Sequence, residues 1–328
     1  MTTYDLLGIG NALVDVLSDA DEKFLADKGL PKGGMQLVDE DRADVLYGLM
    51  DDPRQASGGS CANSMAGFAS LGGKGAFIGK LKDDSFGRAF QKDMAEMGCT
   101  FAGVPSTDGL PTGRCLVYVT PDAQRTMCTH LGVASLLAPE DLDEGALASS
   151  NIVYMEGYLF DQPVAQQAML RAAELAHAAG GAVALTLSDS FCIDRHRDAF
   201  LELVEHHTDI LFANEQEIIS LYQTDSFENA VNRVTGKCGI ICITRSEKGA
   251  VILSKNERVN ISAEPIETLV DTTGAGDQFA AGFLYGHSQG MDLAASGRIG
   301  AIAAAEVISH YGARPEQDLA SLVAKRIG

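Results

Sequence analysis

The sequence is short of positive charge. Its 328 residues include 25 Lys and Arg against 45 Asp and Glu, which gives a net charge of -20 at pH 7. A surface of this charge repels phosphate backbones and anionic lipid headgroups, so we expect neither nucleic acid nor a membrane as a partner. Hydrophobic residues make up 46% and charged residues 21% of the chain, a composition typical of a packed globular protein.

The sequence also lacks paired cysteines and long apolar stretches. Its seven cysteines are odd in number, scattered, and never spaced as Cys-x-x-Cys, so neither a disulfide framework nor a zinc ribbon is indicated. Residues 1–24 have no basic segment of the kind that begins a signal peptide. No stretch is long and apolar enough to span a bilayer. We therefore expect a cytoplasmic protein.

Short apolar segments alternate with helical patterns from about residue 150 onward. The segments are 152–155, 183–187, 210–213 and 240–244. This alternation predicts βαβ units around a parallel sheet. Because ligands of open parallel sheets bind beyond the carboxyl ends of the strands, the residues that follow these segments should line one crevice. They are Glu156-Gly157, Ser188-Asp189-Ser190, Asn214-Glu215 and Arg245-Ser246.

The first 130 residues follow a different pattern. The apolar residues predict strands within 6–17, 116–119 and 126–131, the last two as a hairpin, and helices over 58–71 and 86–97. We infer a small β element built from separated segments beside the main sheet. It would form either a lid over the crevice or an edge extension that covers the core.

Residues 271–277, Asp-Thr-Thr-Gly-Ala-Gly-Asp, form the strongest local signal and precede an apolar helical pattern. Two glycines at the start of a helix let a ligand approach the backbone. Unpaired N–H groups from about Ala275 to Asp277 would form an anion site that the helix dipole assists, with phosphate as the expected ligand. Asp277 has two interpretations: a charge that only stabilises the helix, or a carboxylate that accepts a proton beside the phosphate.

Two familiar phosphate-binding motifs are missing. Residues 8–13 lack the third glycine of the dinucleotide fingerprint, and no Gly-Lys pair is followed by Ser or Thr, as a P-loop requires. If the protein transfers phosphoryl groups, it uses another cradle, in which positioning and charge neutralisation supply most of the rate.

Polar residues near the start of the chain could bind a polyhydroxy ligand. Asn11 and Asp15 lie four residues apart, and residues 58–63, Gly-Gly-Ser-Cys-Ala-Asn, open a predicted helix. Carboxylates and amides together recognise vicinal hydroxyls. Turn formation and a helix N-cap at Ser60 explain the same residues without a ligand, and both interpretations stay open.

Asn214 and Glu217 allow a similar pair of interpretations. Their spacing matches a capping box at the start of a helix. Their position after a predicted strand would also let them orient a hydrated magnesium ion, which keeps several waters and takes few protein ligands.

Residues 271–277 and the pattern Gly58-Gly59-Ser60-x-x-Asn63, with Gly72-Gly73 downstream, resemble the two signatures of the ribokinase-like (PfkB) carbohydrate kinase family. The resemblance covers essentially the whole chain. It is strongest to the adenosine kinase subgroup, through segments 10–15, 111–115, 209–215 and 312–318. It implies an α/β fold: a three-layer αβα domain over 1–328 with a mainly parallel central sheet, and β-sheet lid segments inserted at about 12–50 and 108–131.

The resemblance also implies an activity. ATP, with magnesium, would donate its γ-phosphoryl group to a primary hydroxyl, here the 5′-hydroxyl of a nucleoside, with adenosine as the first candidate. Asp277 would take the hydroxyl proton, with a pKa that the helix N-terminus lowers. Gly274, Ala275 and Gly276 would form the anion hole. Arg125 would reach the phosphates when the lid closes; otherwise it is a solvated hairpin arginine.

The residues that the resemblance assigns to the acceptor fall into two groups. The hydroxyl-binding group is Asn11, Asp15, Gly58, Gly59, Ser60 and Asn63, within which Asp15, Gly59 and Asn63 would hold the ribose. The purine pocket would be Leu13, Gln36, Cys115, Met127, Tyr158 and Phe191. Plain core packing is the alternative for each pocket residue.

The resemblance places the donor on the other side of the crevice. ATP would contact Asn214, Thr244, Ser246, Gly249, Thr273, Gly274 and Gly276, with the helix over 299–309 behind the adenine. Asn214 and Glu217 match the element that organises magnesium, through water. Asp271 and Thr273 lie where relatives bind a monovalent cation, usually potassium, mainly through backbone carbonyls.

The acceptor and the oligomeric state stay open at this stage. Cys61 and Ala62 replace the bulkier polar pair of eukaryotic adenosine kinases, so guanosine, inosine, or a free sugar such as ribose or fructose is the alternative acceptor. A third possibility is a catalytically inactive nucleoside-binding regulator, although Asp277 and both glycines count against it. Either a monomer or a homodimer is compatible with a lid of this kind.

Overall fold

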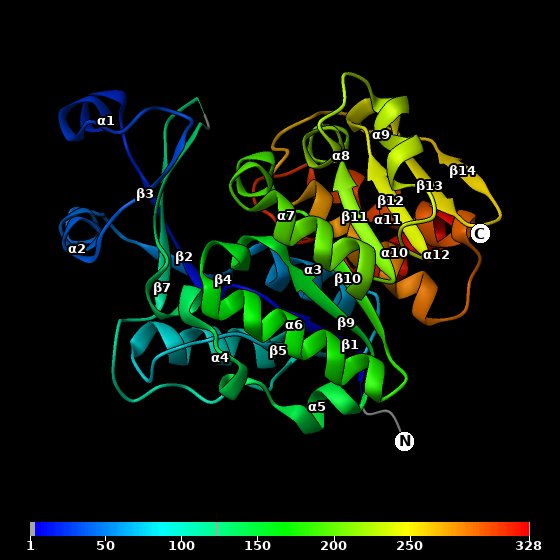
Figure 1. Ribbon diagram of the computed structural model, residues 1–328. Helices are drawn as coiled ribbons and strands as arrows, with labels where there is room; N and C mark the ends of the chain where they lie inside the picture. Colours follow the sequence, from blue (N-terminus) through cyan, green and yellow to red (C-terminus); the bar gives the residue numbers. More distant parts are fainter. Residues whose placement is uncertain (1–3, 123, 328) are drawn as a thin grey trace.

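The computed structural model describes residues 4–122 and 124–327 (Figure 1). Its centre is a nine-stranded sheet in the order β14-β13-β12-β11-β10-β9-β1-β5-β6. Strands β12 to β6 in this order run parallel, whereas β13 runs antiparallel to both of its neighbours, β12 and β14. The strands are β1 (Tyr4–Ile9), β5 (Gly75–Ile78), β6 (Thr100–Phe101), β9 (Ser150–Glu156), β10 (Ala182–Thr186), β11 (Ile210–Asn214), β12 (Ile240–Thr244), β13 (Ala250–Ser254) and β14 (Arg258–Ile261).

Helices cover both faces of this sheet. One face carries α5 (Glu144–Ala148), α6 (Pro163–Ala178), α7 (Ser190–His207), α8 (Glu215–Tyr222) and α9 (Phe227–Val234). The other face carries α3 (Ser60–Ser70), α4 (Ser85–Glu96), α10 (Ala275–Ser288) and α11 (Leu293–Val307), with α12 (Leu319–Ile327) packed against α11. In Figure 1, α6 lies in front of the sheet and α10 behind it. The predicted three-layer αβα fold is therefore confirmed.

The apolar strands of the sequence owe their composition to these two layers. Val153 and Met155 of β9 lie in the core on one face of the sheet, whereas Ile152 and Tyr154 lie in the core on the other. A parallel strand that is covered on both faces is apolar at successive positions, because neither set of alternate side chains meets water. This explains why the segments from residue 150 onward are continuous rather than alternating.

A second, five-stranded sheet stands to one side of the main sheet, at the left of Figure 1, in the order β3-β8-β7-β2-β4. Its strands are β2 (Leu13–Asp19), β3 (Met35–Leu37), β4 (Arg54–Gly58), β7 (Gly113–Val119) and β8 (Arg125–His130), and its chain segments also form α1 (Glu22–Lys28) and α2 (Glu40–Tyr47). β7 and β8 pair as an antiparallel hairpin, as predicted. Residue 123 of the predicted turn lies outside the described residues. β4 lies outside the two predicted lid segments.

The loops between these elements contain short 3-10 helices: η1 (Gly132–Leu136), η2 (Pro139–Asp141), η3 (Gly157–Asp161) and η4 (Ser246–Lys248). In the described part of the chain, no helix has the length and apolarity needed to cross a membrane.

Candidate functional site

Two neighbouring chain segments connect the small sheet to the main domain. The first runs from the end of β1 at Ile9 to the start of β2 at Leu13, and the second from the end of β4 at Gly58 into α3. Gly59 has a φ of 99°, and a Cβ there would overlap the carbonyl oxygen of Asn11. A Cβ at Gly58 would overlap the carboxylate of Asp15. The glycine pair therefore lets Asn11 and Asp15 lie against the start of α3.

Asp277, in the first turn of α10, accepts hydrogen bonds from two residues of α3. Ser60 Oγ donates a hydrogen bond of 2.6 Å to Asp277 Oδ1, and Asn63 Nδ2 donates one of 3.2 Å to Asp277 Oδ2. Gly274, the N-cap of α10, has a φ of 80°, and a Cβ there would overlap Ala313. The two glycine-bearing motifs of the sequence, far apart along the chain, are thus brought together at one carboxylate.

The start of α10 also offers unpaired donors. Ala275 N–H bonds the Thr272 carbonyl at 3.3 Å, and Gln278 N–H bonds the Gly274 carbonyl at 2.8 Å. Among the described residues, the N–H groups of Gly276 and Asp277 have no such acceptor. Free N–H groups at the start of a 14-residue helix suit an anion, which the helix dipole also attracts.

The protonation of Asp277 differs from the expectation. Burial raises the pKa of Asp277 to about 6, although the hydrogen bonds from Ser60 and Asn63 act to lower it. The prediction that the helix N-terminus lowers this pKa is wrong, because loss of hydration outweighs the dipole here. A carboxylate of this pKa is still mostly ionised at neutral pH and is a stronger base than an exposed aspartate.

Glu156 is a buried carboxylate of the site that the sequence interpretation missed. It is 1% exposed at the carboxyl end of β9, and it accepts hydrogen bonds from Asn11 Nδ2 at 2.8 Å and Cys61 N–H at 2.9 Å. Burial raises its pKa to about 7. Asn11 Oδ1 is buried and has no donor among the described residues. The sequence signal for this role is a carboxylate directly at the carboxyl end of a predicted strand, where it faces the crevice.

The register of the small sheet decides which predicted pocket residues share a face. Asp15 pairs with Cys115, and Leu13 lies two residues away on the same face of β2. Met127 follows on this face, since Cys115 pairs with Thr129 and Val117 with Met127. Residues directly opposite each other in a sheet project to the same side.

Gln36 is not brought to this group. It pairs with Cys128, which in turn pairs with Leu116, on the opposite face of the small sheet from Asp15. Gln36 Nε2 lies 3.5 Å from Cys128 Sγ. Asp15 and Cys115 therefore share a face from which Gln36 points away.

Tyr158 and Phe191 lie just past the carboxyl ends of β9 and β10. Their side chains are 38% and 74% exposed, so core packing does not account for either ring. Tyr158 is held by Ser188: its N–H bonds Ser188 Oγ at 3.2 Å, and its hydroxyl bonds the Ser188 carbonyl at 3.3 Å. The two aromatic rings are open to a ligand at this edge of the sheet.

Arg125 reaches from the small sheet to the loop before α10. Its Nη1 lies 3.2 Å from Asp271 Oδ2, and its side chain is 16% exposed, so it is not a solvated hairpin arginine. Asp271 also accepts hydrogen bonds from Thr273 N–H, Thr273 Oγ and Gly312 N–H. Burial acts to raise the pKa of Asp271, but these bonds and the charge of Arg125 hold it below its ordinary value.

Asn214 and Glu217 form the predicted capping box. Glu217 N–H donates to Asn214 Oδ1 at 2.8 Å, and Asn214 N–H donates to Glu217 Oε2 at 2.9 Å. Glu217 is 6% exposed, and burial raises its pKa to about 7. Its carboxylate oxygens keep lone pairs that could hold the water shell of a magnesium ion, so the donor set fits an ion bound through water.

The remaining residues that are predicted to contact ATP lie near the carboxyl end of β12. Thr244 ends this strand, and Ser246 begins η4 directly after it. Gly249 has a φ of 82°, and a Cβ there would overlap the Ile261 carbonyl. Among residues 4–122 and 124–327, no group of three or more His, Cys, Asp or Glu side chains could hold a metal ion.

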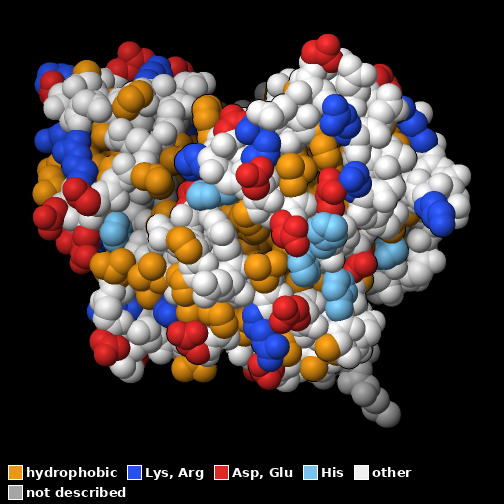
Figure 2. Space-filling view, in the orientation of Figure 1, with side chains coloured by type: hydrophobic (Ala, Val, Ile, Leu, Met, Phe, Trp, Pro, Cys, Tyr) orange, Lys and Arg blue, Asp and Glu red, His pale blue; other side chains and the backbone are white. Residues whose placement is uncertain are grey.

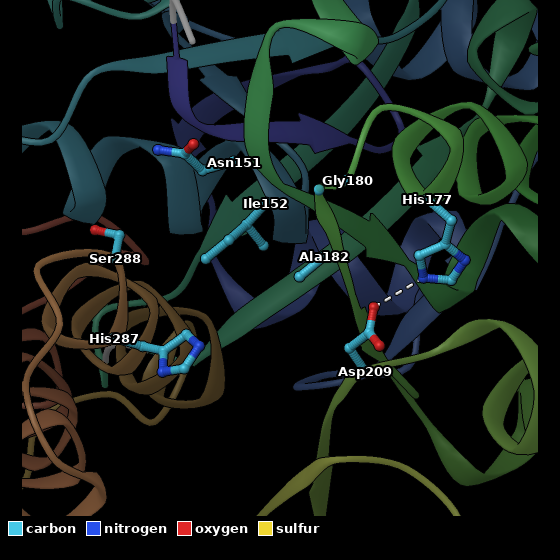
Figure 3. Close-up of a pocket in the computed structure, with 9 residues that line it drawn as sticks. Asn151, Ile152, His177, Gly180, Ala182, Asp209, His287 and Ser288 are labelled. Carbon is cyan, nitrogen blue, oxygen red and sulfur yellow. Dashed lines mark hydrogen bonds and ion pairs between the residues drawn. The ribbon is translucent and has the colours of Figure 1, made fainter.

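A separate surface pocket lies at the other ends of the strands (Figure 3). His177 Nε2 lies 2.8 Å from Asp209 Oδ2, and Ile152 and Ala182 come from the amino-terminal parts of β9 and β10. None of the predicted site residues lines this pocket. Ligands of parallel sheets bind at the opposite, carboxyl ends of the strands, so the candidate active site lies elsewhere. Figure 2 shows the surface hollowed between the lobes of the two sheets.

Comparisons with known proteins agree with this geometry. Residues 35–319 match the family described as pfkB family carbohydrate kinase. The structure of adenosine kinase from Sinorhizobium meliloti is 44% identical, covers 99% of both chains and has a TM-score of 0.90. A probable sugar kinase from Rhizobium etli CFN 42 is 45% identical, again over 99% of both chains, with a TM-score of 0.91. Adenosine kinase from Saccharomyces cerevisiae is 26% identical over 94% of this chain and 96% of its own.

The fold and the site are those of a ribokinase-like phosphotransferase: a mainly parallel sheet, a small second sheet, and a carboxylate at a glycine-led helix start. The chain belongs to the pfkB family of carbohydrate kinases, as the two signatures predicted.

Proposed function

We propose that the protein transfers the γ-phosphoryl group of ATP to the 5′-hydroxyl of a nucleoside, with adenosine as the preferred acceptor. The observation that carries this proposal is the Asp277 carboxylate, held by Ser60 and Asn63 beside the unpaired N–H groups of Gly276 and Asp277. A base and an anion site within one helical turn suit the transfer of a phosphoryl group to a hydroxyl.

Asp277 accepts the proton of the attacking hydroxyl. Its pKa of about 6 keeps it ionised in most molecules at pH 7. A loose phosphoryl-transfer transition state releases this proton late, so a base of moderate strength is sufficient. The N–H groups at the start of α10 stabilise the charge that develops on the transferred group.

Asn11, Asp15 and Asn63 bind the hydroxyls of the acceptor. In the part of the chain that the structure describes, buried Asn11 Oδ1 has no hydrogen-bond donor, and a hydroxyl of the bound nucleoside would supply one. Glu156 holds the other end of the same amide at 2.8 Å, which fixes Oδ1 as the free atom. The Asn11 amide is therefore already oriented before a polyhydroxy ligand binds, which lowers the entropic cost of binding.

The donor binds at the carboxyl ends of β11 and β12, near Asn214, Thr244, Ser246 and Gly249. Asn214 and Glu217 would hold magnesium through water, and the ion would neutralise charge on the phosphates when bound. Arg125 would move from Asp271 to the phosphates when the small sheet closes. A potassium ion bound near Asp271 and Thr273 stays a prediction. Such an ion would use mainly backbone carbonyls, since the Asp271 carboxylate already contacts the Arg125 guanidinium.

A free sugar is the second candidate acceptor, because the probable sugar kinase of Rhizobium etli is as similar to this chain as the adenosine kinase of Sinorhizobium meliloti. The exposed rings of Tyr158 and Phe191 favour a base, since a purine can stack on them and a bare sugar leaves them unused.

The deciding experiment measures ADP release with ATP and magnesium across adenosine, guanosine, inosine, ribose and fructose, with each product identified by mass. We expect adenosine to have the highest kcat/KM by at least about tenfold, a margin of roughly 1.4 kcal/mol. A sugar in first place would overturn the nucleoside assignment. Tight nucleoside binding without turnover would instead indicate a regulator.

A further inference from the structure

Arg314 lies next to the candidate active site, and the sequence interpretation assigns no role to its side chain, although segment 312–318 contributes to the family resemblance. It comes from the segment between α11 and α12, and its side chain is 19% exposed. Its Nη1 donates to Asp93 Oδ2 at 2.8 Å, and its Nε lies 3.4 Å from Asn63 Oδ1. Arg314 therefore connects α4 to the residue of α3 that contacts Asp277.

The chemistry of the guanidinium decides how the Asn63 amide is turned. Arginine nitrogens only donate, so the atom of Asn63 that faces Nε must be the oxygen. The amide Nδ2 is then directed to Asp277 Oδ2, at 3.2 Å. Turning the amide over would place a donor against the guanidinium and an oxygen against the carboxylate, and both contacts would be repulsive.

The backbone around Arg314 is held by contacts that do not involve its side chain. Gln278 is fully buried, and its Nε2 donates to the carbonyls of Asn63 and Ala313, both at 2.9 Å. Gly274 packs directly on Ala313, where a Cβ would overlap it. A substitution at Arg314 should therefore leave this segment in place.

We propose that Arg314 is a positioning residue of the acceptor site: it fixes the Asn63 amide so that Nδ2 faces Asp277. The inference rests on the proposed function, because it assigns Arg314 to acceptor binding and not to the binding of ATP. Arg314 contacts Asp93 through Nη1 and Asn63 through Nε, which explains why an arginine, with several donors in one plane, occupies this position.

The test compares Arg314→Met with the wild type in full-length protein. We expect the Kd and KM for adenosine to rise about tenfold and kcat to fall, with the KM for ATP changed less than about twofold. Arg298→Met is the matched control, since Arg298 contacts Glu264 and the Arg326 carbonyl away from the site. It should leave all kinetic constants unchanged. Thermal melting of both variants verifies that they fold.

A double-mutant cycle with Asn63→Ala, followed through the Kd for adenosine, separates positioning from general support. We expect Arg314→Met to change the Kd less than about twofold in the Asn63→Ala background, because the amide that it orients is gone. Equal effects in both backgrounds, or an equal rise in the KM for ATP, would overturn the role of Arg314 alone. A wild-type protein that neither binds nor phosphorylates any nucleoside would refute the proposed function as well.

Discussion

The substitution Asp277→Asn tests the role of Asp277 as a base without changing the shape of the site. The variant has the same shape, and both neighbours can adapt: the new amide oxygen can accept from Asn63 Nδ2, and its nitrogen can donate to Ser60 Oγ. These contacts replace bonds of 3.2 and 2.6 Å in the parent protein. Only the ability to take a proton is lost, so we expect the Kd for adenosine to change less than about threefold.

The loss in turnover follows from the role of a general base. Such a base contributes about 10²- to 10⁴-fold to rate, so kcat should fall by this factor, equivalent to roughly 3–5 kcal/mol. The pH dependence gives a second test. Because burial raises the pKa of Asp277 to about 6, its active, ionised form is lost as the pH falls through 6, and the parent's kcat should fall with it.

The assay is steady-state ADP release between pH 5 and 8, with adenosine binding measured by titration. Asp292→Asn is the control, since Asp292 caps α11 through the Ala295 N–H in an exposed position at another helix start. It should keep full activity. Turnover of Asp277→Asn within about tenfold of the parent would refute the assigned base. So would an acid limb that persists unchanged in the variant's residual activity.

Three further predictions test neighbouring parts of the site. Arg125→Ala should lower kcat more than it raises either KM, because its charge acts on the phosphates during transfer; steady-state kinetics showing the reverse pattern would make it a ground-state contact. Burial raises the pKa of Glu156 to about 7, so the folded state binds its proton more tightly than the unfolded chain, and stability should fall as the pH rises from about 4.5 to 7. Urea unfolding at pH 5 and 8 should show this fall in the parent, by up to roughly 3 kcal/mol from this group, and less of it in Glu156→Gln; equal falls would contradict the assignment. Gly59→Ala should lower the melting temperature more than Gly72→Ala, since both have positive φ but only Gly59 has a carbonyl oxygen where the Cβ would stand; equal melting temperatures would mean that the backbone around Gly59 can relax.

Much of the main sheet could be predicted because the apolar sequence of its strands indicates that they are buried on both faces. Residues 152–155 and 240–244 are apolar at successive positions, which only a strand covered on both faces requires, and both lie within strands of the structure. The start of α10 could also be predicted, because a glycine before an apolar helical pattern supplies a backbone conformation that other residues rarely adopt. The capping box of Asn214 and Glu217 was correct for the same reason.

Other features could not be predicted from the sequence. Gln36 seemed a pocket residue, but strand pairing with β8 turns it to the far face of the small sheet. β3 is a three-residue strand, too short for its own pattern to set its register. Glu156 was placed at the right end of the sheet without a role, because its partners Asn11 and Cys61 come from distant segments.

The sequence by itself determined the family, the alternation of strands and helices from about residue 150 onward, and the two glycine motifs that flank the site, since these depend on neighbours within a few residues. Only the tertiary structure decided the charge state of Asp277 and the contact of Arg314 with Asn63. Both depend on burial and on side chains that lie 214 and 251 positions apart in the chain. Electrostatic effects of this kind act through space and carry no local pattern along the sequence.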